Sequence, residues 1–303
     1  MLTQILITGS EGLIGRALCA ALRRTQTVVV PFDLRSPAGP ACGDVREADR
    51  LKEAARGCTG IIHLAAVSRV VWGEQDPARC WETNVEGTRN VLRAAQSFPE
   101  QPFVVLASSR EVYGQPASLP AGEDTPLSPV NVYGRSKHAA EQLITEAQAD
   151  GLRAVVLRFS NVYGCAQDHA DRVVPAFARA AAAGHPLRVD GPDHLFDFTH
   201  VDDTIRGILA AANVLAAGER RCPPIHLLTG VATSLGELAA LACELAGVNS
   251  PIVAGPPRTF DVARFYGDPA RARALLGWEP RVTVREGLAR LIQDVRDGAG
   301  GAS

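Results

Sequence analysis

Short apolar runs alternate with helix-length segments along the first half of the chain. The apolar runs are rich in β-branched residues, as buried strands are. Because they are continuously apolar, both faces of the sheet they form should be covered by helices, which is typical of parallel sheets. The expected strands are 5–7, 28–30, 60–64, 103–106 and 154–159, and the expected helices are 13–24, 47–56, 81–98 and 134–148.

The pattern becomes less regular beyond residue 164. Helices are expected at 172–184, 202–217 and 235–246, with short strands at 186–189 and 225–228. We therefore predict an α/β fold with a doubly wound parallel sheet of Rossmann type and a smaller, sequence-interleaved C-terminal substrate lobe. Residues 1–164 should form the Rossmann domain and residues 165–303 mainly the lobe, with about 195–230 returning to the sheet.

Composition and charge narrow the possible functions. The chain of 303 residues has a net charge of −2, which gives no electrostatic attraction to nucleic acid or to an anionic membrane. Its seven cysteines are scattered without a CxxC pair, which favours a reducing compartment and argues against a metal site. No apolar run approaches the roughly 18 residues of a membrane span, and no basic-then-apolar leader is present. We expect a cytoplasmic protein.

A glycine-rich segment, ITGSEGLIG, follows the first expected strand and opens the first expected helix. Its glycines allow a tight turn and the close approach of a pyrophosphate to a helix N-terminus. Asp33 ends the second strand, where a carboxylate accepts both ribose hydroxyls and repels a 2′-phosphate, so NAD is favoured over NADP. The alternative is an ordinary turn with a surface aspartate. The expected cofactor residues are Gly9, Gly12, Leu13, Ile14, Gly15, Asp33, Asp44, Val45, Leu64, Ala65, Ala66, Tyr133 and Lys137.

The segment YGRSK places Tyr133 and Lys137 four residues apart, so they share one face of a helix. A nearby ammonium, together with a positive nicotinamide, would lower the pKa of the phenol and make Tyr133 a usable base near neutrality. The alternative is an exposed pair on a helix. Ser109 ends the preceding strand, where its hydroxyl would share a proton with the same substrate oxygen.

The motifs TGxxGxxG, HLAA, NVEGTRNVL, SSREVYG, YGRSK, RFSNVYG and HVDD occur in this order. Together they resemble the extended short-chain dehydrogenases/reductases, and more narrowly the NAD-dependent nucleotide-sugar epimerases and dehydratases. The resemblance covers nearly the whole chain. It implies that Tyr133 removes the proton of a sugar hydroxyl, usually at C4, while NAD takes hydride from the same carbon. Lys137 would bind the nicotinamide ribose, and Ser109 would orient the hydroxyl.

The same resemblance makes Glu111 the residue that separates two reactions. In family members that dehydrate, a glutamate at this place removes the C5 proton, whereas many 4-epimerases have small residues there. Arg110 stands where those dehydratases place an acid or a hydrogen-bonding residue, and arginine is a poor proton donor. Strand alternation should point Ser109 and Glu111 one way and Arg110 outward. We slightly favour 4-epimerisation over dehydration, which includes the 5,6-type, and over net NAD(P)H-dependent reduction of another carbonyl compound.

The resemblance also implies a substrate site for a nucleotide sugar. Asn161 is expected to contact the substrate diphosphate, and Arg258 matches one of the two arginines that bind it. Phe196 stands where the family often has the other, so Arg172 or Arg264 would have to replace it. No residue selects the nucleotide.

A homodimer is expected by the same resemblance, through helices near 84–98 and 134–148. The predicted catalytic residues are Tyr133, Lys137, Ser109 and Glu111, the predicted substrate residues are Ser109, Asn161 and Arg258, and no metal is expected.

Overall fold

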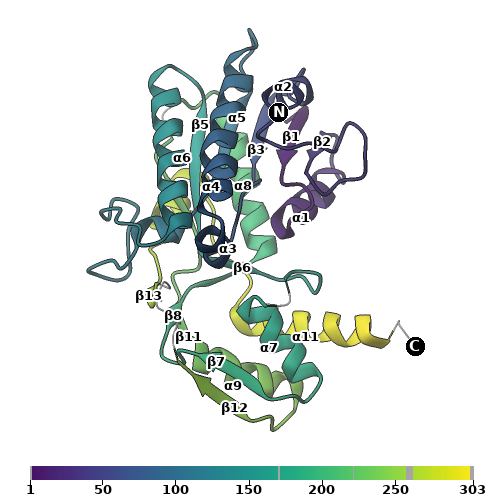
Figure 1. Cartoon of the computed structure of the whole chain (residues 1–303), viewed down its shortest axis with the longest axis vertical. Coiled ribbons are helices and arrows are strands. Elements are labelled where there is room, and N and C mark those ends of the chain that lie inside the picture. Colours follow the sequence, from purple (N-terminus) through teal and green to yellow (C-terminus); the bar gives the residue numbers. More distant parts are fainter. Residues whose placement is uncertain (1, 170, 221, 257–261, 301–303) are drawn as a thin grey trace.

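The structure is a computed structural model that describes residues 2–169, 171–220, 222–256 and 262–300. Its largest sheet has six strands in the order β10-β5-β4-β3-β1-β2, and all neighbours in it run parallel (Figure 1). This sheet confirms the predicted doubly wound α/β fold. The strands are β1 (Gln4–Thr8), β2 (Val28–Phe32), β3 (Gly60–His63), β4 (Phe103–Ser109), β5 (Ala154–Phe159) and β10 (Ile225–Leu227).

Helices cover both faces of this sheet, as its continuously apolar strands require. In β1, Ile5 and Ile7 are buried in the cluster that contains α1 and α8, whereas Leu6 is buried in the cluster that contains α2, α5 and α6. Successive side chains therefore enter opposite layers, and each layer needs an apolar residue. The bounds are α1 (Leu13–Leu22), α2 (Ala48–Ala54), α5 (Gly87–Gln96), α6 (Val132–Ala149) and α8 (Val201–Ala216).

A second group of elements lies below the sheet in Figure 1 and has its own apolar core. It interleaves in sequence with α8 and β10, which belong to the large sheet. Strands β12 and β7 pair in parallel, β11-β8-β13 form a small mixed sheet, and β6 pairs with β9. The remaining bounds are β6 (Asn161–Tyr163), α7 (Val173–Ala182), β7 (Leu187–Asp190), β8 (Leu195–Phe196), β9 (Phe198–His200), β11 (Thr233–Ser234), α9 (Leu235–Ala246), β12 (Ile252–Gly255), β13 (Arg264–Phe265), α10 (Ala270–Leu276) and α11 (Val284–Gly300).

The expected helix at 81–98 is three successive helical segments. These are α4 (Pro77–Trp81), a π-helical turn (Glu82–Glu86) and α5, and a further helix, α3 (Val70–Gln75), precedes them. Asn84 in the π turn accepts a hydrogen bond from the Val67 amide at 2.8 Å and donates one to Ser136 Oγ at 2.8 Å. The turn therefore ties the loop after β3 to α6, next to the predicted catalytic residues.

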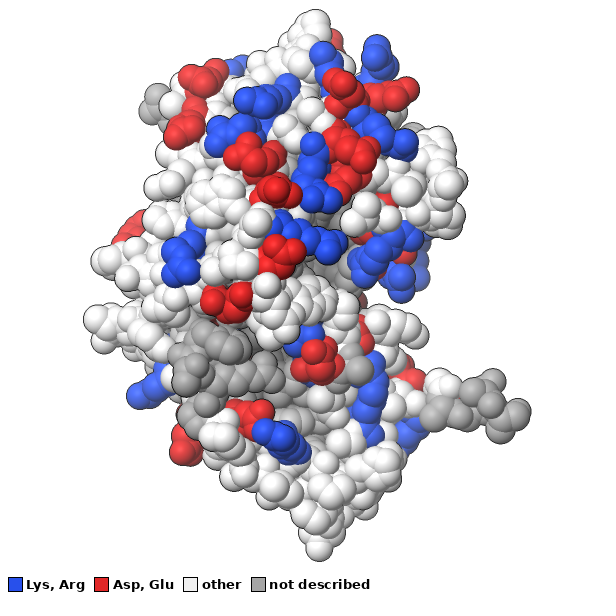
Figure 2. Space-filling view, viewed as in Figure 1, with Lys and Arg blue, Asp and Glu red and all other residues white. Residues whose placement is uncertain are grey.

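Acidic and basic side chains are interspersed on the face of the molecule drawn in Figure 2. This mixture agrees with the net charge of −2. Within the described ranges, no helix is both long enough and apolar enough to span a membrane.

A buried ion pair connects α6 to the centre of the sheet. Arg158 of β5 donates to Glu141 of α6 through Nη2 at 2.7 Å and Nε at 3.0 Å, and both side chains are about 95% buried. Ser108 of β4 also donates to Glu141. Arg158 Nη1 donates to Tyr113 Oη at 2.6 Å, which lies 2.6 Å from His226 Nε2 of β10. One polar network therefore joins three neighbouring strands to the helix that carries Tyr133 and Lys137.

We expect Glu141→Ala to lower the free energy of unfolding by about 3–5 kcal/mol, because it leaves the Arg158 guanidinium buried without its partner. Urea denaturation at pH 7 measures the loss. The matched control is Glu244→Ala, which breaks an exposed pair with Arg285 on another helix and should leave stability unchanged within error. Equal losses in the two variants would contradict the role of the buried pair.

Candidate active site

The glycine-rich turn after β1 lines a cavity of about 980 Å³. Gly9 has a φ of +72°, and a Cβ there would lie 2.6 Å from the Ala65 nitrogen. A Cβ on Gly15 would lie 2.1 Å from the carbonyl oxygen of Gly9. Both positions therefore require glycine. Helix α1 begins at Leu13 without a side-chain cap, so its first N–H groups can bind a pyrophosphate.

Asp33 lies directly after β2 and lines the same cavity. Its Oδ2 accepts a hydrogen bond from the Glu11 amide at 2.9 Å, and its Oδ1 accepts one from the Arg35 amide at 2.8 Å. These bonds fix the carboxylate where it can accept ribose hydroxyls. The predicted cofactor residues on this cavity are Gly9, Gly12, Leu13, Asp33, Asp44, Val45, Leu64, Ala65 and Ala66.

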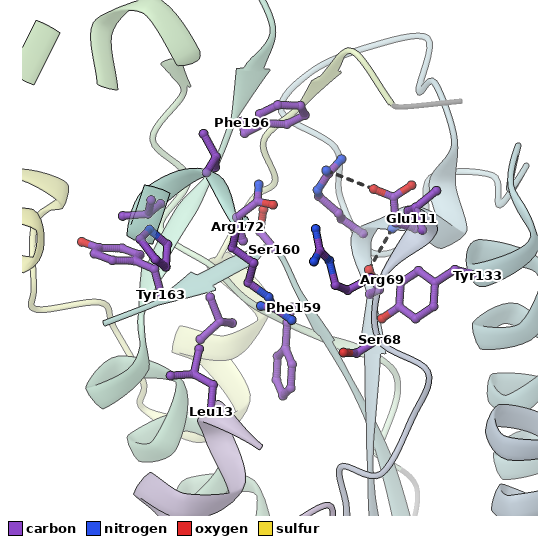
Figure 3. Close-up of a pocket in the computed structure, with 18 of the residues that line it drawn as sticks. Leu13, Ser68, Arg69, Glu111, Tyr133, Phe159, Ser160, Tyr163, Arg172 and Phe196 are labelled. Carbon is purple, nitrogen blue, oxygen red and sulfur yellow. Dashed lines mark hydrogen bonds and ion pairs between the residues drawn. The ribbon is translucent and has the colours of Figure 1, made fainter. Parts of the chain in front are cut away.

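An adjoining cavity of about 440 Å³ contains the predicted reacting groups. It shares the glycine turn with the first cavity, and Figure 3 shows Tyr133 and Glu111 on one side of it and Tyr163 on the other. The structure brings together on it the predicted residues Ile14, Gly15, Ser109, Glu111, Tyr133, Lys137 and Asn161. Arg258 lies outside the described residues.

Helix α6 presents Tyr133 and Lys137 on one buried face. Asn131 caps the helix by accepting a hydrogen bond from the Gly134 amide at 2.7 Å. Lys137 Nζ donates to the Ala107 carbonyl at 2.9 Å and lies 5.9 Å from the centre of the Tyr133 ring. Both side chains are at least nine-tenths buried, so the alternative of an exposed helical pair is wrong.

Without NAD, the protein raises the pKa of Tyr133 to about 12, whereas the sequence predicted a lowered value beside a bound, positively charged nicotinamide. Burial is the main cause, hydrogen bonding to the Ser109 hydroxyl lowers this pKa, and the charge of Glu111 raises it. Burial also lowers the pKa of Lys137 to about 8. Tyr133 therefore needs a further positive charge beside it to ionise near neutrality.

The chain changes direction immediately after Ser109. Strand β4 ends there, Arg110–Tyr113 form a 3₁₀ turn, and Ser109 Oγ accepts a hydrogen bond from the Glu111 amide at 3.2 Å. Strand alternation therefore does not continue, because successive residues of such a turn are about 120° apart. The prediction that Arg110 faces outward was wrong. Its side chain lines the cavity and is only 11% exposed.

Two side chains hold the Glu111 carboxylate, which is 7% exposed. Arg110 Nη2 lies 3.0 Å from Oε1, and Asn131 Nδ2 donates to Oε2 at 2.8 Å. Oε1 therefore has an ion-pair partner, and Oε2 has a hydrogen-bond donor.

Phe196 supports the guanidinium of Arg110. The Cζ atom of Arg110 lies 4.6 Å from the centre of the Phe196 ring and 5.9 Å from that of Phe265, which are cation–π distances. Phe196 replaces an expected arginine, and Arg110 replaces an expected acid. The two departures that the sequence showed separately are therefore in contact.

The sequence reasoning missed Arg69, which also lines the cavity. Its guanidinium lies 5.2 Å from the Trp72 ring and forms an ion pair with Asp171. The segment carries no motif, so only the neighbouring tryptophan signalled a packed arginine. Of the two arginines expected to replace the residue at position 196, Arg172 lines both cavities, while Arg264 is exposed on β13.

The profile of the NAD dependent epimerase/dehydratase family matches residues 5–221. The chain belongs to this family. The UDP-glucose 4-epimerase of Mycolicibacterium smegmatis is 33% identical over 242 residues, which cover 78% of this chain and 76% of that protein. MoeE5 in complex with UDP-glucuronic acid and NAD is 31% identical with a TM-score of 0.89, covering 97% of this chain and 99% of that chain. The dTDP-glucose 4,6-dehydratase DesIV from Streptomyces venezuelae is 28% identical with a TM-score of 0.87, covering 99% of this chain and 98% of that chain.

This epimerase/dehydratase family member is an NAD-dependent enzyme of sugar nucleotides. Its cofactor is NAD, and the glycine turn, the uncapped start of α1 and the fixed carboxylate of Asp33 fit that dinucleotide. In the part of the chain that the structure describes, no group of three or more His, Cys, Asp or Glu side chains is placed to hold a metal.

We expect Lys137→Met to stabilise the fold at neutral pH. The pKa of Lys137 is about 8 in the folded state and 10.5 without the protein environment, so the unfolded state binds more protons between these values. The contribution of Lys137 to wild-type stability should therefore be least favourable below pH 8 and become more favourable towards pH 10.5. Methionine removes the buried charge at similar length, and the gain at pH 7 should be about 1–3 kcal/mol. Urea denaturation at pH 7 and pH 10 tests this, and a variant less stable than wild type at pH 7 would contradict it.

Proposed function

We propose that this protein is a nucleotide-sugar 4-epimerase that works through a transient 4-keto sugar. The observation that supports this most is the convergence of Ser109, Tyr133 and Lys137 on one cavity that shares the glycine turn with the NAD cavity. The names of the relatives agree with it, since several are UDP-glucose 4-epimerases. A structural relative, MoeE5, binds UDP-glucose with NAD. We therefore propose a UDP-hexose as the substrate class.

In this proposal Tyr133 takes the proton of the C4 hydroxyl as a general base. Ser109 hydrogen-bonds to the same hydroxyl and holds it towards the phenol. Lys137 is fixed by the Ala107 carbonyl and favours the phenolate through its charge. NAD, which the glycine turn and Asp33 would hold, would supply a further positive charge and the hydride chemistry at C4. After the keto sugar has rotated and is reduced on its other face, Tyr133 returns the proton to the C4 oxygen.

We also propose that the elements around α7, α9 and α11 form the substrate lobe and that Arg172 and Asn161 contact the diphosphate. Figure 3 shows Arg172 directed into the cavity. Its Nε lies 3.7 Å from Asp168 Oδ1, which is beyond hydrogen-bonding distance. This leaves the guanidinium able to bind a phosphate.

The charges on the cavity favour an uncharged sugar. Three of its arginines are each paired with a carboxylate on the same cavity, and these pairs cancel their own charges. Among the described residues of this cavity, Arg172 and Lys137 are the cations without a carboxylate partner that also lines it, and they suit a diphosphate. The pairs are Arg69 with Asp171, Arg110 with Glu111, and Arg188 with Asp190.

We propose a homodimer through α5 and α6, which pack side by side on one face of the sheet (Figure 1). Trp81, at the end of α4 that leads into α5, is 45% exposed and gives this region an apolar surface. Light scattering of the wild-type protein would show a dimer mass, and a monomer at all concentrations would contradict the proposal.

Tyr133→Phe should lower turnover by about 10²- to 10⁴-fold, because the general base is removed. Folding and NAD binding should stay close to wild type, since only one hydroxyl is lost. Thermal unfolding and NAD titration check these two properties. The matched control is Tyr163→Phe on the opposite side of the cavity, which should keep most of the activity. Retained turnover in Tyr133→Phe would overturn the assignment.

Incubation of the wild-type protein with UDP-, dTDP-, GDP- and CDP-sugars tests the proposed reaction. Mass spectrometry and NMR should show a product of unchanged mass with new coupling constants at C4, most readily from a UDP-hexose. Added NADH should not be consumed in proportion to product.

A nucleotide-sugar dehydratase is the second candidate, because Glu111 lines the cavity beside Ser109. The structural relative DesIV is named as a dTDP-glucose 4,6-dehydratase. A product that has lost the mass of one water would favour this candidate, and stoichiometric consumption of NAD(P)H would favour a reductase.

A further inference from the structure

Glu111 places a carboxylate beside the reacting atoms that the proposed 4-epimerase does not use. It lines the cavity together with Ser109 and Tyr133, and its charge is close enough to Tyr133 to raise the pKa of that phenol. A ketone at C4 makes the hydrogens on the two neighbouring carbons acidic. A free carboxylate at this place would be able to remove one of them. Loss of that proton would scramble a second stereocentre or begin an elimination, so an epimerase has to restrain Glu111.

The restraint is visible at both carboxylate oxygens. Arg110 holds Oε1 at 3.0 Å, and Asn131 holds Oε2 at 2.8 Å. Asn131 cannot turn away freely, because its own carbonyl oxygen caps α6 by accepting from the Gly134 amide. A swing of Glu111 towards the substrate would therefore break a charge-assisted contact with Arg110, and such contacts are among the stronger ones in proteins.

Arg110 is itself held by aromatic rings. Phe196 supports its guanidinium at 4.6 Å and Phe265 at 5.9 Å. Its Nη1 is buried without a hydrogen-bond partner among the described residues, so Glu111 is its main polar contact there. Figure 3 shows Phe196 and the ion pair of Glu111 at the same end of the cavity. An arginine at position 196 would bring a second cation near this guanidinium and repel it. Phenylalanine at this position instead attracts the guanidinium through its ring.

We propose that Arg110, supported by Phe196, is a positioning residue that determines reaction specificity by keeping Glu111 from acting as a base on the keto sugar. This proposal rests on the proposed 4-epimerase function. When Arg110 is removed, Glu111 takes a proton from the carbon next to the ketone. The C–H bond breaks, and its electron pair forms an enolate with the ketone oxygen. In D₂O the carboxyl group exchanges its proton with solvent and returns a deuteron to the same carbon.

The test is turnover of the accepted nucleotide sugar in D₂O by wild type and by Arg110→Met, with deuterium per turnover read by mass spectrometry and its position by NMR. Wild type should give only a low background of deuterium at the carbons next to C4. Arg110→Met should raise deuterium uptake there by roughly 10- to 100-fold, the factor expected when a hydrogen bond to a charged group is lost. The double variant Arg110→Met/Glu111→Gln should return to the wild-type level, because the amide is not a base.

The matched control is Arg188→Met, which removes another arginine of the same cavity that pairs with a nearby carboxylate, Asp190, at 2.8 Å. Its deuterium uptake per turnover should stay at the wild-type level. Should Arg110→Met not fold or not turn over, Phe196→Leu gives the same test, because it keeps the charge and removes only the aromatic support. Uptake in this variant should exceed the wild-type level.

Wild-type-level uptake in a variant that turns over, or uptake that persists in the double variant, would overturn the proposal. Labelling by wild type at every turnover would overturn it too, since Glu111 would then act as a base while paired. Failure of the proposed function is a separate result, because wild type would then epimerise none of the nucleotide sugars tested.

Discussion

The buried ion pair between Glu141 and Arg158 fixes the reacting groups relative to the sheet. Glu141 lies one helical turn beyond Lys137 on α6, and Ser108, which donates to Glu141, is the neighbour of Ser109 in β4. The pair therefore sets the helix that carries Tyr133, the proposed base, against the strand that carries Ser109, the hydroxyl proposed to orient the substrate. Breaking a buried pair leaves an uncompensated charge, so a shift of helix α6 along the strand that separated Glu141 from Arg158 would be costly. Residues outside the cavity thereby position the groups that we propose to be catalytic.

Much of the fold could be predicted from the sequence because of the way in which the long strands are buried. Ile5, Leu6 and Ile7 alternate between two helix layers, and both layers demand apolar residues. The pattern therefore indicates a covered parallel sheet directly. Strands of two or three residues, such as β8 and β13, are too short to show any periodicity, and only their tertiary partners define them. The π turn at Glu82–Glu86 is hidden for a similar reason, because its flanking helices continue the same pattern.

The candidate site could be predicted as far as its motifs reach. The spacing of Tyr133 and Lys137 predicts a shared helix face, and the end of β4 predicts the place of Ser109, and the structure has both features. The spacing does not show how deeply Tyr133 is buried, however. Burial raises the pKa of Tyr133 by desolvation, and this effect outweighs the favourable contact with Ser109. The direction of the Arg110 side chain was predicted wrongly for a related reason. A single hydroxyl, that of Ser109, starts a 3₁₀ turn, and no strand pattern contains that information.

Two departures from the family pattern illustrate how a site changes in coupled steps. Considered separately, Phe196 stands where the family often has an arginine. Arg110 stands where its dehydratases have an acid or a hydrogen-bonding residue. In the structure they form one unit, with the guanidinium of Arg110 on the ring of Phe196 and against the carboxylate of Glu111. Two cations near 4 Å apart in such a partly buried place would repel by on the order of 4 kcal/mol. Arginine at both positions would therefore be unfavourable, and Arg110 has the carboxylate of Glu111 as its partner. The identity of residue 196 thus bears on whether Glu111 is free to react, although the two side chains lie on different elements.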